Sequence, residues 1–207
     1  MKMVRLGNTG VTVSRICLGC MSYGDPKWRA WVLDERAAMP FFRRAVENGV
    51  NFFDTADMYS LGISEEFTGR SLREYAKLDE CIVATKVFNA MSDGPNMKGL
   101  SRKHIVQGCE ASLRRLGIET IDLYMLHRPD LLADPEEVAK AFSQLKEAGK
   151  VRYFGVSNFR PTLLTALQVV CRMPLVVHQV EISLAKLDAF TDGTLDQCLI
   201  EQITPWA

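Results

Sequence analysis

Residues 81–86 read Cys-Ile-Val-Ala-Thr-Lys, an apolar run of strand length that ends in a charged residue. A helix-forming stretch follows, with Ser101 placed to cap its first turn. It carries an apolar stripe at spacings of four and three, made of Ile105, Cys109, Leu113 and Leu116. The next apolar run, residues 121–127, reads Ile-Asp-Leu-Tyr-Met-Leu-His. This order predicts two parallel strands joined by a helical crossover.

The same alternation extends outward in both directions along the chain. Further strands are predicted at residues 16–19, 51–54, 153–158 and 175–182, with a last fragment at 203–207. The other predicted helices are at 34–48 and 194–202, one with Ser64 as its cap, one with Asp134 as its cap and Pro135 at the first position, and one that opens at Pro161. Pro40 leaves open a later start for the first of these helices.

Residues 4–6 and 11–13 flank the turn-forming cluster Gly-Asn-Thr-Gly, which predicts an N-terminal hairpin. The alternation after it fits either a doubly wound sheet or a closed barrel. A nucleotide-binding doubly wound sheet usually carries G-x-G-x-x-G after its first strand, and this sequence has none. We therefore predict one domain, residues 1–207, with the fold of an incomplete (β/α)8 TIM barrel of about six and a half β/α units.

The composition is that of a globular protein, with 207 residues, 47% of them apolar, and 25 basic against 25 acidic side chains. A neutral chain argues against a dedicated nucleic-acid-binding protein, which needs a basic face. The sequence shows neither the apolar run of a signal peptide nor the roughly 20 apolar residues of a membrane span. Six scattered cysteines favour a reducing, cytoplasmic location.

Four polar residues lie at the ends of three consecutive predicted strands: Asp54, Tyr59, Lys86 and His127. Asp54, Lys86 and His127 share strand parity with apolar residues that would fill the barrel interior. Active sites of such barrels lie at the C-terminal ends of the strands. Each of the four alone is more simply explained as a structural or solvated residue. Together, at neighbouring strand ends, they predict a proton-transfer site.

The chemistry follows from the residue types. Lys86 and Asp54 can each stay charged when paired in a buried place. The ammonium is then predicted to lower the pKa of Tyr59 below its free value of about 10, which makes the phenol a general acid for a carbonyl oxygen. His127 is placed to donate a hydrogen bond to that oxygen.

Ser157, Asn158 and Gln179 form a second group of polar residues, at the ends of the next two predicted strands. Their hydroxyl and amide groups can bind a carboxamide, which offers both a donor and an acceptor. The alternative is that Ser157 and Asn158 cap the helix that starts at Pro161.

Three stretches give the sequence a strong resemblance to the aldo/keto reductase family. They are residues 51–56 with Tyr59, residues 124–129, and residues 149–159. The resemblance covers essentially the whole chain and implies NADPH-dependent reduction of a small aldehyde or ketone without a metal. It implies that Tyr59 donates the proton, Lys86 and Asp54 tune it, and His127 orients the substrate. It also implies that Ser157, Asn158 and Gln179 hold the nicotinamide carboxamide, with Asp54 near the nicotinamide ribose.

A full barrel takes roughly 250 residues, and this chain stops within its seventh predicted strand. We therefore expect it to be a fragment of a longer reading frame. The choice of NADPH over NADH comes from the resemblance alone, because the segments that bind the adenosine phosphate in relatives come after residue 207.

Two other functions stay open at this stage. One is a regulatory binding module that keeps the pocket but turns over slowly or not at all. The other is a lyase or aldolase that uses Lys86 as a Schiff base. Tyr23, Trp28 and Trp31 either line an apolar pocket or pack on the rim. The sequence specifies neither the carbonyl substrate nor the oligomeric state.

Overall fold

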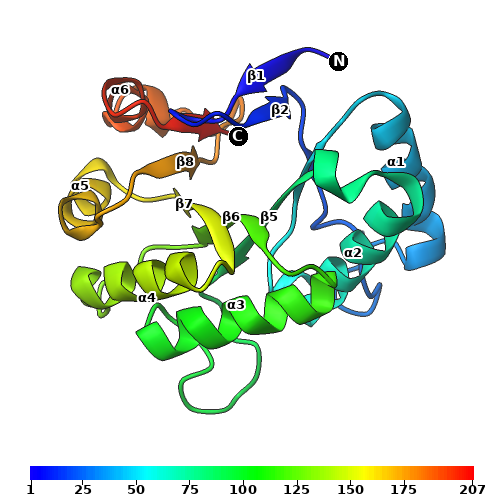
Figure 1. Ribbon diagram of the computed structural model, residues 1–207, viewed down its shortest axis with the longest axis horizontal. Helices are drawn as coiled ribbons and strands as arrows, with labels where there is room; N and C mark the ends of the chain where they lie inside the picture. The colour runs from blue at the N-terminus through cyan, green and yellow to red at the C-terminus, as the bar shows by residue number, and fades with distance from the viewer.

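The computed structural model describes all residues, 1–207, and consists of a curved parallel sheet, six α-helices and a separate hairpin (Figure 1). The strands of the sheet are β3 (Leu18–Gly19), β4 (Phe52–Asp54), β5 (Ile82–Val87), β6 (Ile121–Leu126), β7 (Val151–Ser157), β8 (Leu175–Gln179) and β9 (Thr204–Trp206). The helices are α1 (Glu35–Glu47), α2 (Ile63–Tyr75), α3 (Arg102–Leu116), α4 (Pro135–Glu147), α5 (Pro161–Val170) and α6 (Thr194–Ile200). Short 3₁₀ turns lie at Tyr59–Gly62, Leu78–Glu80 and Asp188–Phe190.

The seven strands are hydrogen-bonded in sequence order, from β3 to β9, and all neighbours are parallel. A doubly wound sheet would reverse its strand order at a switch point, and no reversal occurs here. The helices lie along the outer, convex side of the sheet (Figure 1). The predicted incomplete barrel is thus confirmed.

Apolar side chains separate into an inner and an outer core. The inner cluster contains Phe52, Ala84, Leu123 and Met125, the residues whose parity predicted an inward direction. The outer cluster fills the space between the sheet and the helices, as where the Phe142 and Phe154 rings stack 4.1 Å apart. Successive side chains of a strand point to opposite faces, so one strand feeds both cores.

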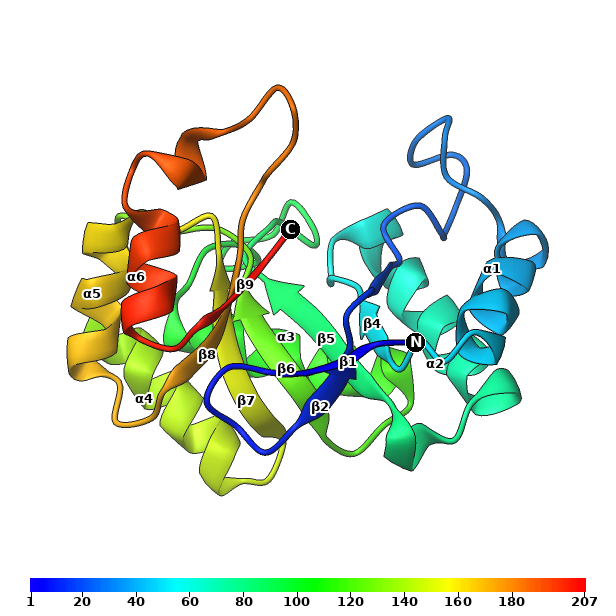
Figure 2. The same ribbon diagram turned by 90° about the horizontal axis from the view of Figure 1, so that it is seen from above.

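The predicted N-terminal hairpin is present as β1 (Met3–Arg5) and β2 (Thr12–Ser14), paired antiparallel. Leu6 and Val13 are buried in the inner cluster. The Gly7 amide donates to Thr204 Oγ1 at 2.5 Å and so links the hairpin to β9. The long loops after β3 and β8 project together from one face of the molecule (Figure 2).

The predicted caps Ser101 and Asp134 are confirmed, since their side chains accept hydrogen bonds from the amides of His104 and Glu136. Asp34 caps α1, accepting a hydrogen bond from the Ala37 amide, and Pro40 lies inside this helix at an exposed position rather than at its start. The prediction that Ser64 caps α2 is wrong. The helix begins after Gly62, and Ser64 is buried within its first turn, where its hydroxyl donates to the Cys20 carbonyl at 2.7 Å.

All six cysteines are free thiols, and five of them are buried. The buried ones are Cys20, Cys81, Cys109, Cys171 and Cys198. None of the helices has the length and apolar character that crossing a membrane requires.

Candidate functional site

The structure brings Asp54, Tyr59, Lys86 and His127 together at the C-terminal ends of β4, β5 and β6. Asp54 ends β4, Lys86 is the last residue but one of β5, and His127 follows β6 directly. Tyr59 opens the 3₁₀ turn of the loop after β4. Their exposed fractions are 6%, 8%, 0% and 9% for Asp54, Tyr59, Lys86 and His127. Four titratable groups therefore share one nearly dry pocket.

Lys86 is the centre of this group. Its Nζ donates to Asp54 Oδ1 at 2.6 Å, to the Thr55 carbonyl at 2.9 Å and to the Tyr59 hydroxyl at 3.2 Å. These contacts use all three donors of the ammonium group. Because the Tyr59 oxygen accepts from Lys86, the phenolic proton remains free to be donated elsewhere.

The loop that carries Tyr59 is held by backbone contacts and by an unusual turn. The Asp57 amide donates to the Lys86 carbonyl at 3.2 Å, and the Tyr59 amide donates to the Ala56 carbonyl at 3.1 Å. Ser60 follows with φ of 50°, in the left-handed region. A Cβ on Gly24 would lie 2.2 Å from Ser60 Oγ, so only glycine lets the β3–α1 loop approach this turn.

The prediction that Lys86 lowers the pKa of Tyr59 below its ordinary value is wrong for this structure. Burial raises the pKa of Tyr59, and the Lys86 ammonium opposes that rise without cancelling it. Burial also lowers the pKa of Lys86, but the Asp54 carboxylate and the Tyr59 hydroxyl more than offset that effect, so the pKa lies above its usual value. Lys86 therefore stays charged, and Tyr59 holds its proton firmly.

His127 is a neutral side chain in this pocket. Burial lowers its pKa to about 3, and the charges of Lys86 and Arg128 act in the same direction. Asn89 Nδ2 lies 3.3 Å from His127 Nδ1 and donates to it, which leaves the proton of the neutral ring on Nε2. The His127 ring meets the Tyr59 ring edge-on, at 83° and 5.7 Å between centroids. Asn89 was not predicted, because it lies beyond the strand end, where parity gives no signal.

Ser157, Asn158 and Gln179 lie beside the first group. Gln179 Nε2 donates to Asp54 Oδ2 at 3.2 Å, which leaves Gln179 Oε1 as an unused acceptor. Asn158 Nδ2 donates to Ser157 Oγ at 3.1 Å, which leaves the hydroxyl proton of Ser157 as an unused donor. One free acceptor and one free donor match the needs of a carboxamide. The residues present therefore fit a nicotinamide.

The alternative explanation of Ser157 and Asn158 as helix caps does not hold. The N-cap position of α5 is Arg160, and no side chain caps this helix. Asn158 Oδ1 instead accepts from the Glu181 amide at 3.1 Å, across to the loop after β8.

A cleft of about 520 Å³ opens above these residues, within the usual size of a ligand site. Tyr59, His127, Ser157, Asn158 and Gln179 line it, and the β3–α1 loop adds Trp28 and Trp31. Tyr23 does not reach the cleft, because it is buried against Phe41 and Phe42, with ring centroids 5.8 and 5.2 Å away. Of the three aromatic residues in this loop, two face the cleft and one packs beneath it.

Asp57 is a further buried acid close to the site that the sequence did not single out. It is 1% exposed, and neither oxygen of its carboxyl group has a hydrogen-bond partner. Burial raises its pKa to about 8, and the nearby buried Glu65 adds to the rise. Its position two residues before Tyr59 is all that marked it in the sequence.

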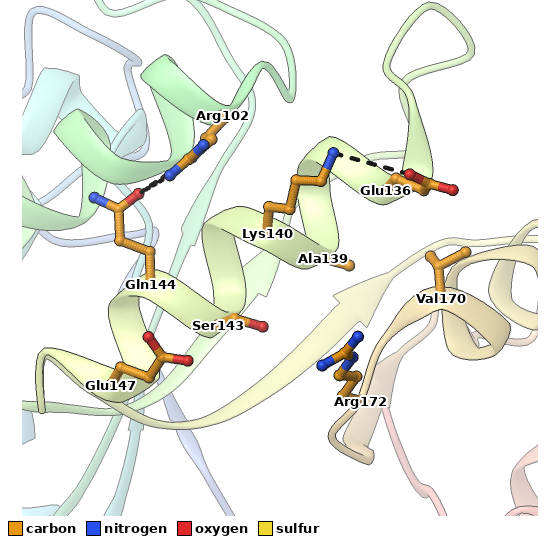
Figure 3. A pocket seen from close by; sticks show the side chains of 9 residues that line it. All are labelled: Arg102, Glu136, Ala139, Lys140, Ser143, Gln144, Glu147, Val170 and Arg172. Atoms are coloured by element: carbon orange, nitrogen blue, oxygen red, sulfur yellow. Dashed lines mark hydrogen bonds and ion pairs between the residues drawn. The ribbon is translucent and has the colours of Figure 1, made fainter.

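A larger groove, of about 660 Å³, lies on the outer helical layer between α3, α4 and the end of α5 (Figure 3). Its charged side chains are of both signs: Arg102, Glu136, Lys140, Glu147 and Arg172. Arg102 donates to Gln144 Oε1 at 2.9 Å, and Lys140 lies 3.8 Å from Glu136. Nothing in it resembles the titratable cluster at the strand ends, so we place the functional site in the smaller cleft.

Comparison with known proteins agrees with this geometry. Residues 15–199 match the sequence profile described as the aldo/keto reductase family. The chain is 37% identical over 186 residues to versiconal hemiacetal acetate reductase of Aspergillus parasiticus, covering 81% of this chain and 54% of that protein. It is 38% identical over 159 residues to aldo-keto reductase YhdN of Bacillus subtilis, covering 77% of this chain and 47% of that protein.

The crystal structure of the thermostable aldo-keto reductase Tm1743, in complex with the inhibitor epalrestat, superposes with a TM-score of 0.86 at 27% identity. The match covers 99% of this chain and 71% of that one. The chain spans about half the length of the curated relatives it matches. The profile match over most of the chain and the shared fold together show that it belongs to the aldo/keto reductase family.

Proposed function

We propose that this chain reduces aldehydes or ketones to alcohols with NADPH as the reductant, and that Tyr59 supplies the proton. The observation that carries the proposal is the position of Lys86 Nζ, in contact with both Asp54 Oδ1 and the Tyr59 hydroxyl. Family membership supports the reaction class, and the substrate would be a small carbonyl compound. The preference for NADPH rests on the family resemblance.

Tyr59 can protonate a carbonyl oxygen because its own oxygen already accepts from Lys86. Its raised pKa keeps the proton in place until negative charge develops on the substrate oxygen. The phenolate that remains after transfer lies 3.2 Å from the ammonium group, which stabilises it in a pocket of low dielectric. Asp54 keeps Lys86 charged throughout.

His127 would orient the same carbonyl. With Nδ1 turned to Asn89, its Nε2–H is the donor that faces the cleft. A neutral donor holds the oxygen without competing with Tyr59 for the proton transfer. Donors positioned before the reaction at the place where charge develops are a major source of catalysis.

The nicotinamide would be held by its carboxamide, between the free acceptor of Gln179 and the free donor of Ser157. When bound, the cofactor supplies a hydride to the carbonyl carbon. Asn158 fixes Ser157, and the Gln179 contact with Asp54 connects this part of the cleft to the proton donor.

The Schiff-base alternative is disfavoured by the contacts of Lys86. Its ammonium makes three hydrogen bonds and has a raised pKa, so the free amine that must attack a carbonyl is scarce. Treatment with borohydride and a carbonyl substrate should leave Lys86 unmodified.

The central test compares the parent chain with Tyr59→Phe, by the loss of NADPH absorbance with a panel of aldehydes. We expect turnover to fall by roughly 10²–10⁴-fold, because a general acid is removed while the Lys86–Asp54 pair stays intact. NADPH binding, followed by cofactor fluorescence, should be retained. Undiminished turnover in Tyr59→Phe would contradict the assignment, and binding without turnover in the parent would indicate a regulatory module instead.

A further inference from the structure

The cleft has two chemically different halves. Ser157, Asn158 and Gln179 lie on the side of β7 and β8, where the proposed function places the nicotinamide. The other half is formed by the β3–α1 loop and by the residue that follows His127. Because the nicotinamide would occupy the first half, the second half is left for a substrate whose carbonyl reaches Tyr59 and His127, which line the same cleft. The side chains there decide which carbonyl compounds fit.

This second half presents an aromatic wall. The rings of Trp28 and Trp31 meet edge-on, with centroids 6.1 Å apart and an interplanar angle of 74°. Trp31 is 50% exposed, so part of its ring is accessible along the cleft that it lines. Two indole rings beside a cleft of this volume form a surface on which a planar ring can stack.

The same half also carries positive charge. Arg29 and Arg128 both line the cleft, both are exposed, and neither forms an ion pair with a carboxylate. The Arg29 guanidinium lies 5.4 Å from the centroid of the Trp28 ring, a cation–π contact that restricts its position. Arg128 is close enough to His127 to contribute to the lowered pKa of that ring.

The negative charge near the cleft does not neutralise these two arginines. Asp54 is paired with Lys86 at 2.6 Å. Glu181 is the one acidic residue that lines the cleft, and it follows β8 on the nicotinamide side. The substrate half is therefore aromatic and cationic, with unused guanidinium donors that bind carboxylates in a two-pronged geometry.

We propose that the preferred substrates are aromatic carbonyl compounds that carry a carboxylate, which Arg128 and Arg29 bind while the ring stacks on Trp28 and Trp31. This inference rests on the proposed function and names its substrate class. The reaction is unchanged: the carbonyl carbon gains a hydride, the carbonyl π bond becomes an O–H bond with the Tyr59 proton, and NADPH is oxidised to NADP⁺.

The test uses two nearly isosteric probes, 4-formylbenzoate and its neutral methyl ester. Binding to the 207-residue chain is measured by quenching of tryptophan fluorescence, and turnover by the loss of NADPH absorbance. We expect the acid to bind roughly tenfold more tightly than the ester, since hydrogen bonds to charged groups are the strong ones. Added salt should weaken binding of the acid and leave the ester unaffected.

Variants assign the preference to residues. Arg128→Gln and Arg29→Gln should each lower the acid-to-ester affinity ratio severalfold, with ester binding unchanged. Arg36→Gln is the matched control, because Arg36 is exposed on α1 and does not line the cleft. A ratio near one in the parent, or a ratio that neither cleft variant changes, overturns the inference even if both probes are reduced. Selective binding of the acid without turnover would support the substrate class and overturn the proposed reduction.

Discussion

Lys86 is a fully buried cation that depends on the acceptors around it. Its ammonium has Asp54, the Thr55 carbonyl and the Tyr59 hydroxyl as partners, and no contact with water is needed. Removing one member of such a pair leaves the other charge buried and unpaired, which costs far more than removing both. The pair is therefore best tested by stability as well as by turnover.

Lys86→Met should lower the free energy of unfolding by about 3–5 kcal/mol, because it leaves Asp54 without its counter-ion. The double variant Asp54→Asn/Lys86→Met should lose clearly less stability, although we expect both variants to lose turnover. Urea unfolding followed by circular dichroism compares the two. A single variant as stable as the double one would mean that the two charges are not coupled.

Asp57 gives a prediction that depends on pH. Its pKa is raised from 3.8 to about 8, so the folded state holds a proton that the unfolded state releases. Stability contributed by this group is present at low pH and falls as the pH rises from about 4 to about 8. Asp57→Asn cannot lose stability in this way, because asparagine does not titrate. The free energy of unfolding of the variant should therefore rise relative to that of the parent across this pH range, and the difference should then stay constant.

Urea unfolding at a series of pH values measures the difference for Asp57→Asn. Asp93→Asn, at an exposed position, is the control and should show little pH-dependent gain. A constant difference between Asp57→Asn and the parent would show that Asp57 is charged in the folded protein.

At this scale the sequence located residues better than it predicted their ionisation. The strand ends and the side-chain parity were enough to group Asp54, Lys86 and His127. The direction of the Tyr59 pKa was missed because it depends on how completely the phenol is buried. The burial of the Tyr59 side chain is a result of tertiary packing, which local sequence patterns do not report.

At the scale of elements, α2 and α3 pack so closely that one position admits only glycine. A Cβ on Gly69 in α2 would lie 2.1 Å from the Leu116 carbonyl oxygen at the end of α3. This contact is with backbone, which cannot rotate away. The two helices support the 3₁₀ turn with Tyr59, because that turn leads directly into α2.

Gly69→Ala should therefore destabilise the protein by roughly 1–3 kcal/mol, the usual cost of overpacking. Helix propensity alone would predict a gain of about 1 kcal/mol. Gly108→Ala in α3 is the matched comparison, because its new Cβ would meet side-chain atoms of Val87 and Tyr124 at 3.0 and 3.2 Å. Gly108→Ala should therefore destabilise the protein less than Gly69→Ala. Thermal unfolding of both variants measures this, and a smaller loss of stability in Gly69→Ala would show that the two helices can move apart freely.

The elements themselves were largely readable from the sequence. The predicted caps Ser101 and Asp134 bond the first turn of their helices in the structure. Asp34, predicted only as the approximate start of a helix, also caps one. Ser64 had the same signature but lies inside α2, because Ser60 and Leu61 are both left-handed and shift the helix start. Left-handed conformation at residues other than glycine leaves little trace in a sequence.

At the scale of the whole molecule, the three buried histidines, His104, His127 and His178, connect folding to acidity, because burial lowers the pKa of each. Burial lowers the pKa of His127 to about 3 and that of His178 to about 4. The neutral His178 ring accepts a hydrogen bond from the Phe159 amide at 3.1 Å, which joins β8 to the end of β7. Both rings must be charged in an unfolded chain at mildly acidic pH.

In the folded protein the pKa values of His127 and His178 lie below the ordinary 6.5. The stability that these neutral rings contribute is therefore complete above pH 6.5 and is lost as the pH falls towards 3. We expect the free energy of unfolding to decline over this range. His178→Gln should show a weaker decline together with lower stability at neutral pH, since glutamine does not titrate. Unfolding curves across the range measure both effects, and equal slopes for variant and parent would exclude His178 as a cause.

The curved sheet with its inner and outer cores was predicted from alternation and parity. The link between hairpin and β9, through Gly7 and Thr204, was not, because it joins residues at opposite ends of the sequence. The cationic character of one half of the cleft was missed for the same reason. Arg29 and Arg128 are ordinary surface residues in the sequence, and only the fold brings both to the lining of one cleft.

The buried thiols offer a way to measure local opening of the folded protein. They are spread along the chain, one beside β3, one before β5 and the others in or next to α3, α5 and α6. An alkylating reagent can reach each one only when its own segment opens. Labelling rates at each cysteine, measured by mass spectrometry, would rank these segments by how often they open, and no substitution is needed.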